Sequence, residues 1–177
     1  MSNLTEKTVI HQGRFLTYAK RASGWEYVER NNATGIVGIV AVTPDNNLLV
    51  ISHLSPPHGK YSYELPAGLS GDTPGQENET LSTAAARELM EETGYEADEL
   101  KLLCQGATSA GMSNEVVSLY RAIGVRKVAA GGGVEGEDIT IHEVPLDSAE
   151  QWLDDKVKTG CVVDLKIYAA LYFAKRS

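Results

Sequence analysis

Three glutamates lie close together in the segment Arg87-Glu88-Leu89-Met90-Glu91-Glu92-Thr93-Gly94. If the segment is helical, Glu91 lies about 60° to one side of Glu88 and Glu92 about 40° to the other, because successive helical residues are rotated by about 100°. Like charges on one helix face repel unless water solvates them or a hard cation holds them. Mg²⁺ and Mn²⁺ prefer oxygen ligands and also bind phosphate oxygens. The segment therefore predicts either a solvated acidic face or a divalent metal site.

The overall charge narrows the kinds of partner. The 177-residue chain has 24 acidic and 16 basic residues, which gives a formal net charge of −8 at pH 7. An acidic surface disfavours non-specific binding to DNA or RNA, so we expect no nucleic-acid partner. An anionic ligand would need a cation between itself and the protein, and a divalent metal is the usual one.

The acidic segment belongs to a longer pattern. Glu64-Leu65-Pro66-Ala67-Gly68 precedes it, and seven residues separate Glu79 from Arg87. Together with Arg87 to Tyr95, these residues resemble the Nudix box, whose pattern is Gly, five residues, Glu, seven residues, then Arg-Glu-apolar-any-Glu-Glu-any-Gly-apolar. The sequence departs from the pattern at its front, because ten residues separate Gly68 from Glu79, which places an insertion within residues 69–78.

The resemblance implies a chemistry. Nudix enzymes use divalent metals to hydrolyse a nucleoside diphosphate linked to another moiety. By position, the metal ligands, for Mg²⁺ or possible Mn²⁺, would be Glu88, Glu91, Glu92 and the carbonyl of Ala67. Arg87 would orient the carboxylates through charge-assisted pairs. Metals that bridge a pyrophosphate neutralise its charge and activate a water molecule.

A closer resemblance, over nearly the whole chain, is to the ADP-sugar pyrophosphatases, and Trp25-Glu26-Tyr27-Val28-Glu29-Arg30, Pro56-Pro57, Gly59 and Tyr61 carry it. It implies that Trp25 stacks on the base, that Glu26 accepts from the amino edge of the base, and that Arg30 supports the stack or a phosphate. In the family this segment reaches the neighbouring subunit, which implies a homodimer with exchanged N-terminal segments. The other interpretation of Trp25 is a core or dimer-contact aromatic.

Further residues are assigned to the substrate by the same resemblance. Glu64 would bind substrate, and Met112 and Glu115 would lie near the sugar or ribose, although Glu115 could equally be a solvated charge at a strand edge. Two departures weaken an assignment to ADP-ribose: Ser55 stands where many relatives have an arginine, and Ala110 where ADP-ribose-specific members have a proline.

The glycine-rich segment 131–138 resembles the family loop that closes over substrate and supplies the general base. Glu135 and Glu137 both fit that role; we favour Glu135, with Glu137 near a metal, and a solvated acidic loop is the alternative. The resulting hypothesis is an enzyme that hydrolyses nucleoside diphosphate sugars, ADP-ribose first. GDP-mannose or another nucleotide sugar, a nucleoside triphosphate or dinucleoside polyphosphate, and a non-catalytic nucleotide sensor remain alternatives. The four histidines form no site by their spacing.

The expected fold is α/β, an α/β/α sandwich of the Nudix type with a mixed sheet. Residues 1–33 are expected to form an N-terminal arm of short strands for dimerisation and base binding, and 34–177 the hydrolase domain. Apolar, β-branched runs at 35–42 and 48–51 flank a turn and predict a β-hairpin. Helices are expected at 79–93, from about 147 to 156 and at 164–175, with Gly94 ending the first.

The sequence also predicts the compartment. The first seven residues are polar, and the longest apolar stretch, 36–42, is about a third of the length that a membrane span needs. We therefore expect a cytoplasmic protein with no membrane partner. Cys104 and Cys161 are too few for a disulfide framework and lie in apolar surroundings, so both are expected to be buried thiols.

Overall fold

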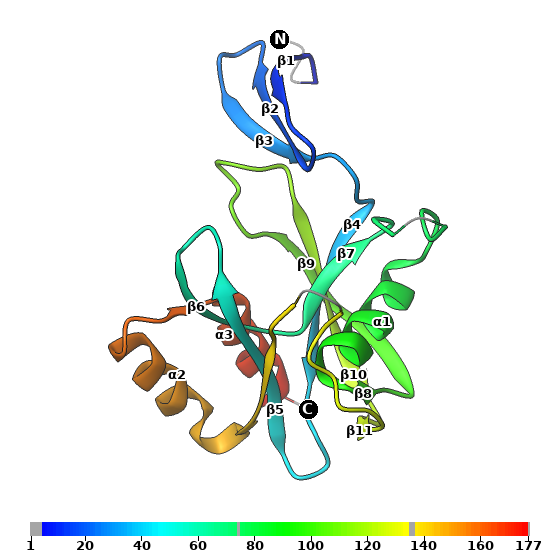
Figure 1. Ribbon diagram of the computed structural model, residues 1–177, viewed down its shortest axis with the longest axis vertical. Helices are drawn as coiled ribbons and strands as arrows, with labels where there is room; N and C mark the ends of the chain where they lie inside the picture. The colour runs from blue at the N-terminus through cyan, green and yellow to red at the C-terminus, as the bar shows by residue number, and fades with distance from the viewer. Residues whose placement is uncertain (1–4, 74, 135–136, 177) are drawn as a thin grey trace.

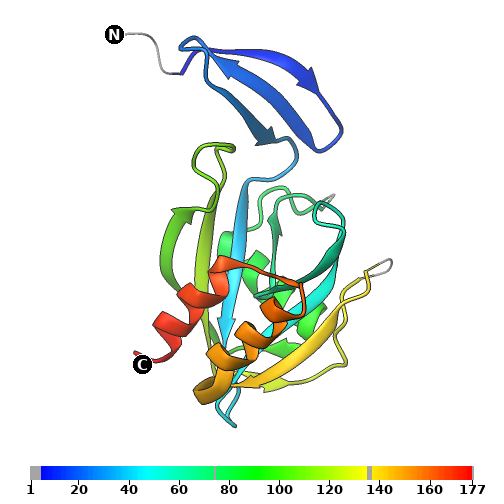
Figure 2. The same cartoon turned by 90° about the vertical axis from the view of Figure 1, so that its left-hand side faces the viewer.

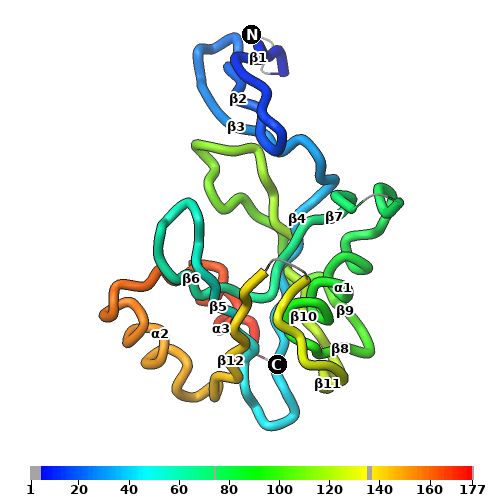
Figure 3. Tube along the Cα trace, viewed as in Figure 1, coloured from blue at the N-terminus to red at the C-terminus, as the bar shows by residue number. Residues whose placement is uncertain are grey.

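A small sheet at the N-terminus extends from the rest of the molecule. The computed structural model describes residues 5–73, 75–134 and 137–176. Strands β1 (Lys7–Gln12), β2 (Leu16–Arg21) and β3 (Glu26–Arg30) form an antiparallel sheet in that order. This sheet, called the arm below, lies at one end of the molecule, next to the connection between β9 and β10 (Figures 1 and 3).

Two mixed four-stranded sheets form the centre of the body. The first has the order β7-β4-β10-β9 and the second β12-β5-β6-β13, and each contains one parallel pair, β10 with β4 and β13 with β6. A two-stranded pair, β11-β8, lies beside them. The strands are β4 (Gly35–Ala41), β5 (Asn47–Ser55), β6 (Lys60–Glu64), β7 (Ala67–Ser70), β8 (Tyr95–Glu96), β9 (Glu99–Ala107), β10 (Val116–Ile123), β11 (Arg126–Lys127), β12 (Thr140–Pro145) and β13 (Val162–Val163).

Helices cover both outer sides of the sheets. Helix α1 (Leu81–Thr93) lies on one side, and α2 (Ala149–Lys158) and α3 (Leu165–Ala174) lie on the other; a 3-10 turn, η1 (Leu146–Ser148), leads into α2 (Figure 2). This arrangement confirms the predicted α/β sandwich with mixed sheets and short N-terminal strands. In the described ranges, no helix combines the length and apolar character that crossing a membrane requires.

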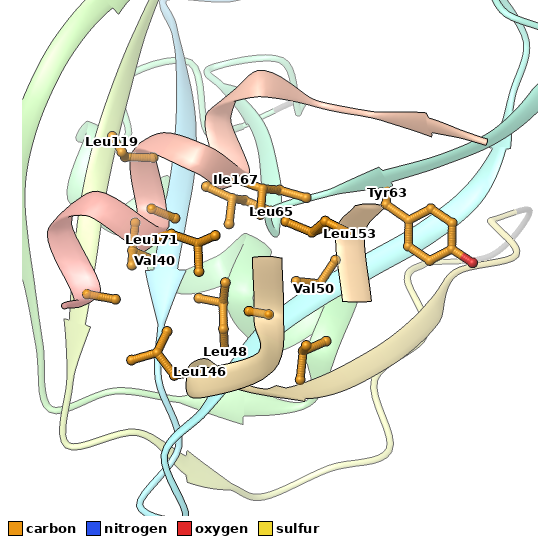
Figure 4. Packing of buried hydrophobic residues seen from close by; sticks show 14 residues of the cluster. Val40, Leu48, Val50, Tyr63, Leu65, Leu119, Leu146, Leu153, Ile167 and Leu171 are labelled. Atoms are coloured by element: carbon orange, nitrogen blue, oxygen red, sulfur yellow. The ribbon is translucent and has the colours of Figure 1, made fainter. Parts of the chain in front are cut away.

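The core explains why the central strands are apolar on both faces. In β4, Val37 and Ile39 pack with Leu89 of α1, whereas Val40 packs with Ile167 of α3, because successive side chains point to opposite faces of a strand. Figure 4 shows this second cluster, in which Ile167 and Leu171 of α3 lie near Val40. Each sheet therefore contributes to two separate apolar layers.

Three local predictions were wrong. The turn between β4 and β5 forms, but the two strands belong to different sheets, and only Val42 and Leu48 pair across it. β4 pairs with β7 and β10 instead, and β5 with β6 and β12. Helix α1 begins at Leu81 rather than at residue 79, since the side chain of Thr80 caps it by accepting from the Thr83 N–H. Cys104 lies on the exposed edge strand β9 and is not buried, and Cys161 is only half-buried.

Candidate functional site

Glu92 lies in the last turn of α1, where the helix packs against the start of β7. Its residue is 8% exposed, and one carboxylate oxygen accepts a hydrogen bond from the Ala67 N–H at 2.9 Å. Burial, together with the nearby charges of Glu88, Glu137 and Glu64, raises the pKa of Glu92 to about 9, although the hydrogen bond from the Ala67 N–H opposes the shift. Without a cation, Glu92 is therefore largely protonated at neutral pH.

Glu88 lies one turn earlier on the same helix and faces the backbone of β7. Burial also raises the pKa of Glu88, to about 7, although Arg87 opposes the shift. A Cβ atom on Gly68 would lie 1.9 Å from the Glu88 carboxyl carbon. A side chain at position 68 would therefore displace the Glu88 carboxylate, which explains the glycine at this position of the motif.

Arg87 ties the acidic helix to the residues before it. One terminal nitrogen donates to Glu88 at 2.9 Å and to Glu91 at 3.0 Å, and the other donates to the Leu69 carbonyl at 2.9 Å and to Glu79 at 3.1 Å. These carboxylates raise the pKa of Arg87, so it stays charged. The guanidinium thus fixes two of the three clustered glutamates and also closes the inserted loop over 69–78.

A cavity of about 330 Å³ adjoins Glu92, and Glu137, Asp138 and His53 also line it. Glu137 accepts from the Val134 N–H at 2.9 Å, which folds its side chain back toward its own loop. His53 and Glu64 bring β5 and β6 to the same place, with Nε2 3.2 Å from a carboxylate oxygen. Glu135 lies outside the described residues.

The donor set fits a divalent metal ion. Glu92 is buried and Glu88 half-buried, both have raised pKa values, and a pair of this kind ionises readily only when a cation compensates the charge. Their hard oxygen atoms suit Mg²⁺ or Mn²⁺. In the ranges that the structure describes, no three acidic, histidine or cysteine side chains form a preassembled cage, and Arg87 holds Glu88 and Glu91 in ion pairs instead.

The predicted base-binding residues gather elsewhere. Trp25 is 60% exposed, so it is not a core residue, and its indole N–H donates to the Gly111 carbonyl at 3.0 Å. Arg30 pairs with Glu115 at 2.7 Å. Met112 is exposed, and its carbonyl accepts from the Val28 N–H.

Glu26 accepts from the Tyr18 hydroxyl within the arm. Arg30, Met112 and Glu115 line a cavity of about 280 Å³ that shares no lining residue with the cavity beside Glu92. The structure thus brings the predicted residues together in two groups: one around α1, and one between the arm and the β9–β10 connection.

The sequence analysis missed His53. Its side chain reaches the site only through the pairing of β5 with β6, in which His53 lies opposite Ser62. No spacing in the sequence signals this contact. His53 and Glu64, 11 residues apart, approach each other through the register of these two strands, which the sequence pattern does not specify.

A family model described as NUDIX domain matches residues 33–159. The chain belongs to the NUDIX domain family. This NUDIX chain is 34% identical over 123 residues to the methanol dehydrogenase activator of Bacillus methanolicus, covering 69% of this chain and 64% of that protein. It is 35% identical over 119 residues to the ADP-ribose pyrophosphatase of Mycobacterium tuberculosis, covering 65% of this chain and 54% of that protein.

A further relative is the GDP-mannose pyrophosphatase of Escherichia coli, which is 32% identical to the NUDIX chain over 103 residues. The match covers 57% of this chain and 52% of that protein. The chain therefore spans only 52–64% of the length of these curated relatives. A crystal structure described as an ADP compounds hydrolase has the same NUDIX fold, with a TM-score of 0.71, 20% identity, and coverage of 99% of this chain and 92% of that one.

Proposed function

We propose that the protein hydrolyses the pyrophosphate bond of nucleoside diphosphate sugars, ADP-ribose first, to a nucleoside monophosphate and a sugar phosphate. Water adds to one phosphorus, the bridging P–O bond breaks, and one water proton passes to a carboxylate. The observation that carries the proposal is the pair of glutamates on α1: Glu92, which is buried and lines a cavity, and Glu88, which is half-buried one turn earlier. Two ionised acids in such surroundings are costly unless a cation is bound in the working state.

The chain's own residues have distinct proposed roles. Glu88, Glu91, Glu92 and the carbonyl of Ala67 would hold Mg²⁺ or Mn²⁺. When bound, the metal neutralises phosphate charge and makes a water more acidic. Arg87 keeps Glu88 and Glu91 oriented, because its guanidinium contacts both carboxylates.

The general base comes from the loop after β11. Glu137 lines the same cavity as Glu92, so a carboxylate of this loop lies beside α1, the helix that carries the proposed metal ligands. Glu135 remains the favoured base of the two, with Glu137 near the metal. A carboxylate in either position would remove the proton as water attacks phosphorus.

The lining of the cavity supports a sugar as the terminal group. Among the described residues that line it, the charged side chains are the carboxylates of Glu92, Glu137 and Asp138, with Leu54, Pro56 and Ile139 as apolar neighbours. Asp138 has no proposed role at the metal, and its carboxylate can accept hydrogen bonds from the hydroxyl groups of a terminal sugar. This favours a nucleotide sugar over a nucleoside triphosphate, while ADP-ribose and GDP-mannose stay alternatives.

The base and its ribose would bind in a second place. We propose that Trp25 stacks on the base, that Glu26 accepts from its amino edge, and that Arg30, Glu64, Met112 and Glu115 complete the substrate contacts. The arm would serve the neighbouring subunit of a homodimer. Large apolar side chains left exposed on the arm support this pairing, since they would be covered there: Val9, Ile10, Phe15, Leu16 and Trp25.

A substrate panel tests the proposal. Purified protein with Mg²⁺ is incubated with ADP-ribose, GDP-mannose or ATP, and products are separated by ion-exchange chromatography. We expect AMP and ribose 5-phosphate from ADP-ribose, and no product after chelation with EDTA. Tight binding of ADP-ribose without any turnover would instead support a nucleotide sensor, and turnover of ATP alone would support a triphosphatase.

A further inference from the structure

The C-terminal end of α1 contacts the segment between β11 and β12, residues 128–139, which is called the acidic loop below. The last carbonyls of a helix have no partner within the helix. Here the Gly132 N–H donates to the Glu92 carbonyl at 2.9 Å, and the Gly133 N–H donates to the Glu91 carbonyl at 3.0 Å. The backbone of two proposed metal ligands is thus bonded directly to the root of the loop that leads to Glu137.

Lys127 adds a charged contact at the same junction. Its ammonium donates to the Thr93 carbonyl at 2.8 Å and to the Ala130 carbonyl at 3.3 Å. One of these carbonyls ends the helix and the other lies in the loop. A cation is also favourable at a helix C-terminus because of the partial negative charge there. In the described ranges, no carboxylate forms an ion pair with Lys127, so its charge acts on these carbonyls.

The position of Lys127 is fixed by the strand pair after the helix. β11 pairs with β8 so that Lys127 lies opposite Tyr95, and the ammonium stands 4.7 Å from the centre of the Tyr95 ring. The Tyr95 hydroxyl donates to Glu143 on β12, the strand that follows the acidic loop. Both ends of the loop are therefore connected to Tyr95, directly after the helix.

Close backbone packing completes the junction. A Cβ atom on Gly94 would lie 2.2 Å from the Ala129 carbonyl oxygen, and one on Gly131 would lie 2.3 Å from the Thr93 carbonyl carbon. Helix end and loop root are thus in direct contact, with no side chain between them. A single ammonium can then reach carbonyls on both.

We propose that Lys127 is a positioning residue, whose ammonium clamps the root of the acidic loop to the end of α1. The clamp fixes the distance between Glu137 and the helix carboxylates Glu91 and Glu92. It acts through the backbone and does not touch the substrate. This inference rests on the proposed hydrolysis, because it assigns the clamp to the geometry that the reaction needs.

The test replaces Lys127 by methionine, which keeps the length of the side chain and removes its charge. Arg126→Met is the matched control, because Arg126 is the neighbouring residue of β11 and pairs only with Glu96 and Asp98 among the described carboxylates. Lys127→Arg is the rescue variant, since a guanidinium can also donate to both carbonyls. Thermal midpoints of all three variants show whether each folds.

We expect Lys127→Met to lower kcat by about tenfold or more with little change in KM, because misplacing a reacting group weakens the transition state more than ground-state binding. Lys127→Arg should recover most of kcat, and Arg126→Met should keep it. Hydrogen exchange should also show faster exchange of the Gly132 and Gly133 amides in Lys127→Met only.

Two results would overturn the clamp. One is a kcat for Lys127→Met equal to that of Arg126→Met. The other is unchanged exchange of the two glycine amides. Failure of the proposed function looks different, because the unaltered protein would then hydrolyse no nucleotide sugar, while amide exchange would still report on the clamp.

Discussion

Glu92 is a carboxylic acid in surroundings that disfavour its charge. It is almost fully buried, it accepts a hydrogen bond from the Ala67 N–H, and other carboxylates lie nearby. A residue of this kind stabilises the folded chain poorly when ionised, so its placement indicates a functional requirement. The same reasoning applies to Glu88, whose pKa is raised less because Arg87 lies beside it.

Replacing Glu92 by glutamine should abolish hydrolysis while preserving the fold. The amide oxygen can still accept from the Ala67 N–H, but a neutral group holds a divalent cation poorly. We expect kcat to fall by about a thousandfold, a typical scale for loss of a group that contacts the reacting centre. Steady-state kinetics check this, with the exposed Glu99→Gln as control; a fully active Glu92→Gln enzyme would refute the metal assignment.

The pKa of Glu92 also predicts how stability depends on pH. In the unfolded chain the group titrates near its ordinary value of 4.5, and in the metal-free folded chain near 9. Between these values the folded state holds one more proton than the unfolded state, so stability falls as pH rises. The thermal midpoint of EDTA-treated protein should therefore decline from about pH 5 to about pH 9, the interval between the two pKa values.

The Glu92→Gln variant supplies the comparison for this pH dependence. Without the carboxyl group, its thermal midpoint should decline less over the same range. Mn²⁺ should stabilise the unaltered protein more at high pH than at low pH, because binding competes with protons. Parallel stability curves for the two proteins would show that Glu92 does not titrate as proposed.

At the scale of elements, the site depends on how closely α1 approaches β7. The helix is anchored at its start by the Thr80 cap, in the middle by Gly68 against Glu88, and at its end by the glycine-rich loop. Arg87 of α1 also donates a hydrogen bond to the Leu69 carbonyl of β7. The carboxylates are therefore held by contacts with two segments far apart in the sequence.

Gly68→Ala should displace Glu88 and impair both stability and hydrolysis. Its Cβ atom would overlap the Glu88 carboxyl group, so helix and strand must separate or the carboxylate must turn away. We expect about 1–3 kcal/mol of destabilisation, the usual cost of overpacking, and a clear loss of kcat. Gly106→Ala is the control, because nothing lies near its Cβ position; equal behaviour of the two variants would contradict the close-approach argument.

Elements differ in how far the sequence predicts them. Helix α1 follows from its local composition and from Gly94, whose φ of 69° permits the left-handed turn that ends it. The turn between β4 and β5 was also predictable from Pro44 and its polar neighbours. The pairing of those strands was not, because an apolar run without alternation does not reveal which neighbour a strand will choose.

At the scale of the whole molecule, the arm is the feature whose role depends on assembly. Within one chain it packs through Trp25 and Val28 on the connection between β9 and β10. Large apolar side chains of the arm are left exposed in the single chain. An exchanged arm would bury these side chains and bring Trp25 to a neighbouring site.

Mixing two inactive variants tests the exchange. In a homodimer with exchanged arms, a Trp25→Ala subunit keeps its own Glu92 and receives an intact Trp25 from a Glu92→Gln partner. Random reassociation should then restore about a quarter of the original activity, because about half the dimers are mixed and each has one complete site. Light scattering measures the dimer, and Trp25→Ala mixed with the double variant Trp25→Ala/Glu92→Gln is the control, because no dimer of these two chains contains an intact Trp25.

Two outcomes would contradict the exchange. A protein that stays monomeric in light scattering has no partner to receive the arm. A dimer in which mixing restores nothing uses each arm in its own chain. Either result leaves the proposed hydrolysis intact, since the carboxylate group on α1 comes from one chain.

The sequence by itself determined the acidic helix and the relative directions of Glu88, Glu91 and Glu92, because helical spacing is a local property of the backbone. It also determined the family, since the motif lies within one short segment. Only the tertiary structure decided that His53 and Glu64 reach this helix, that Lys127 joins its end, and that β4 and β5 part into two sheets. Those contacts depend on which distant apolar surfaces pack together, and no local pattern contains that information.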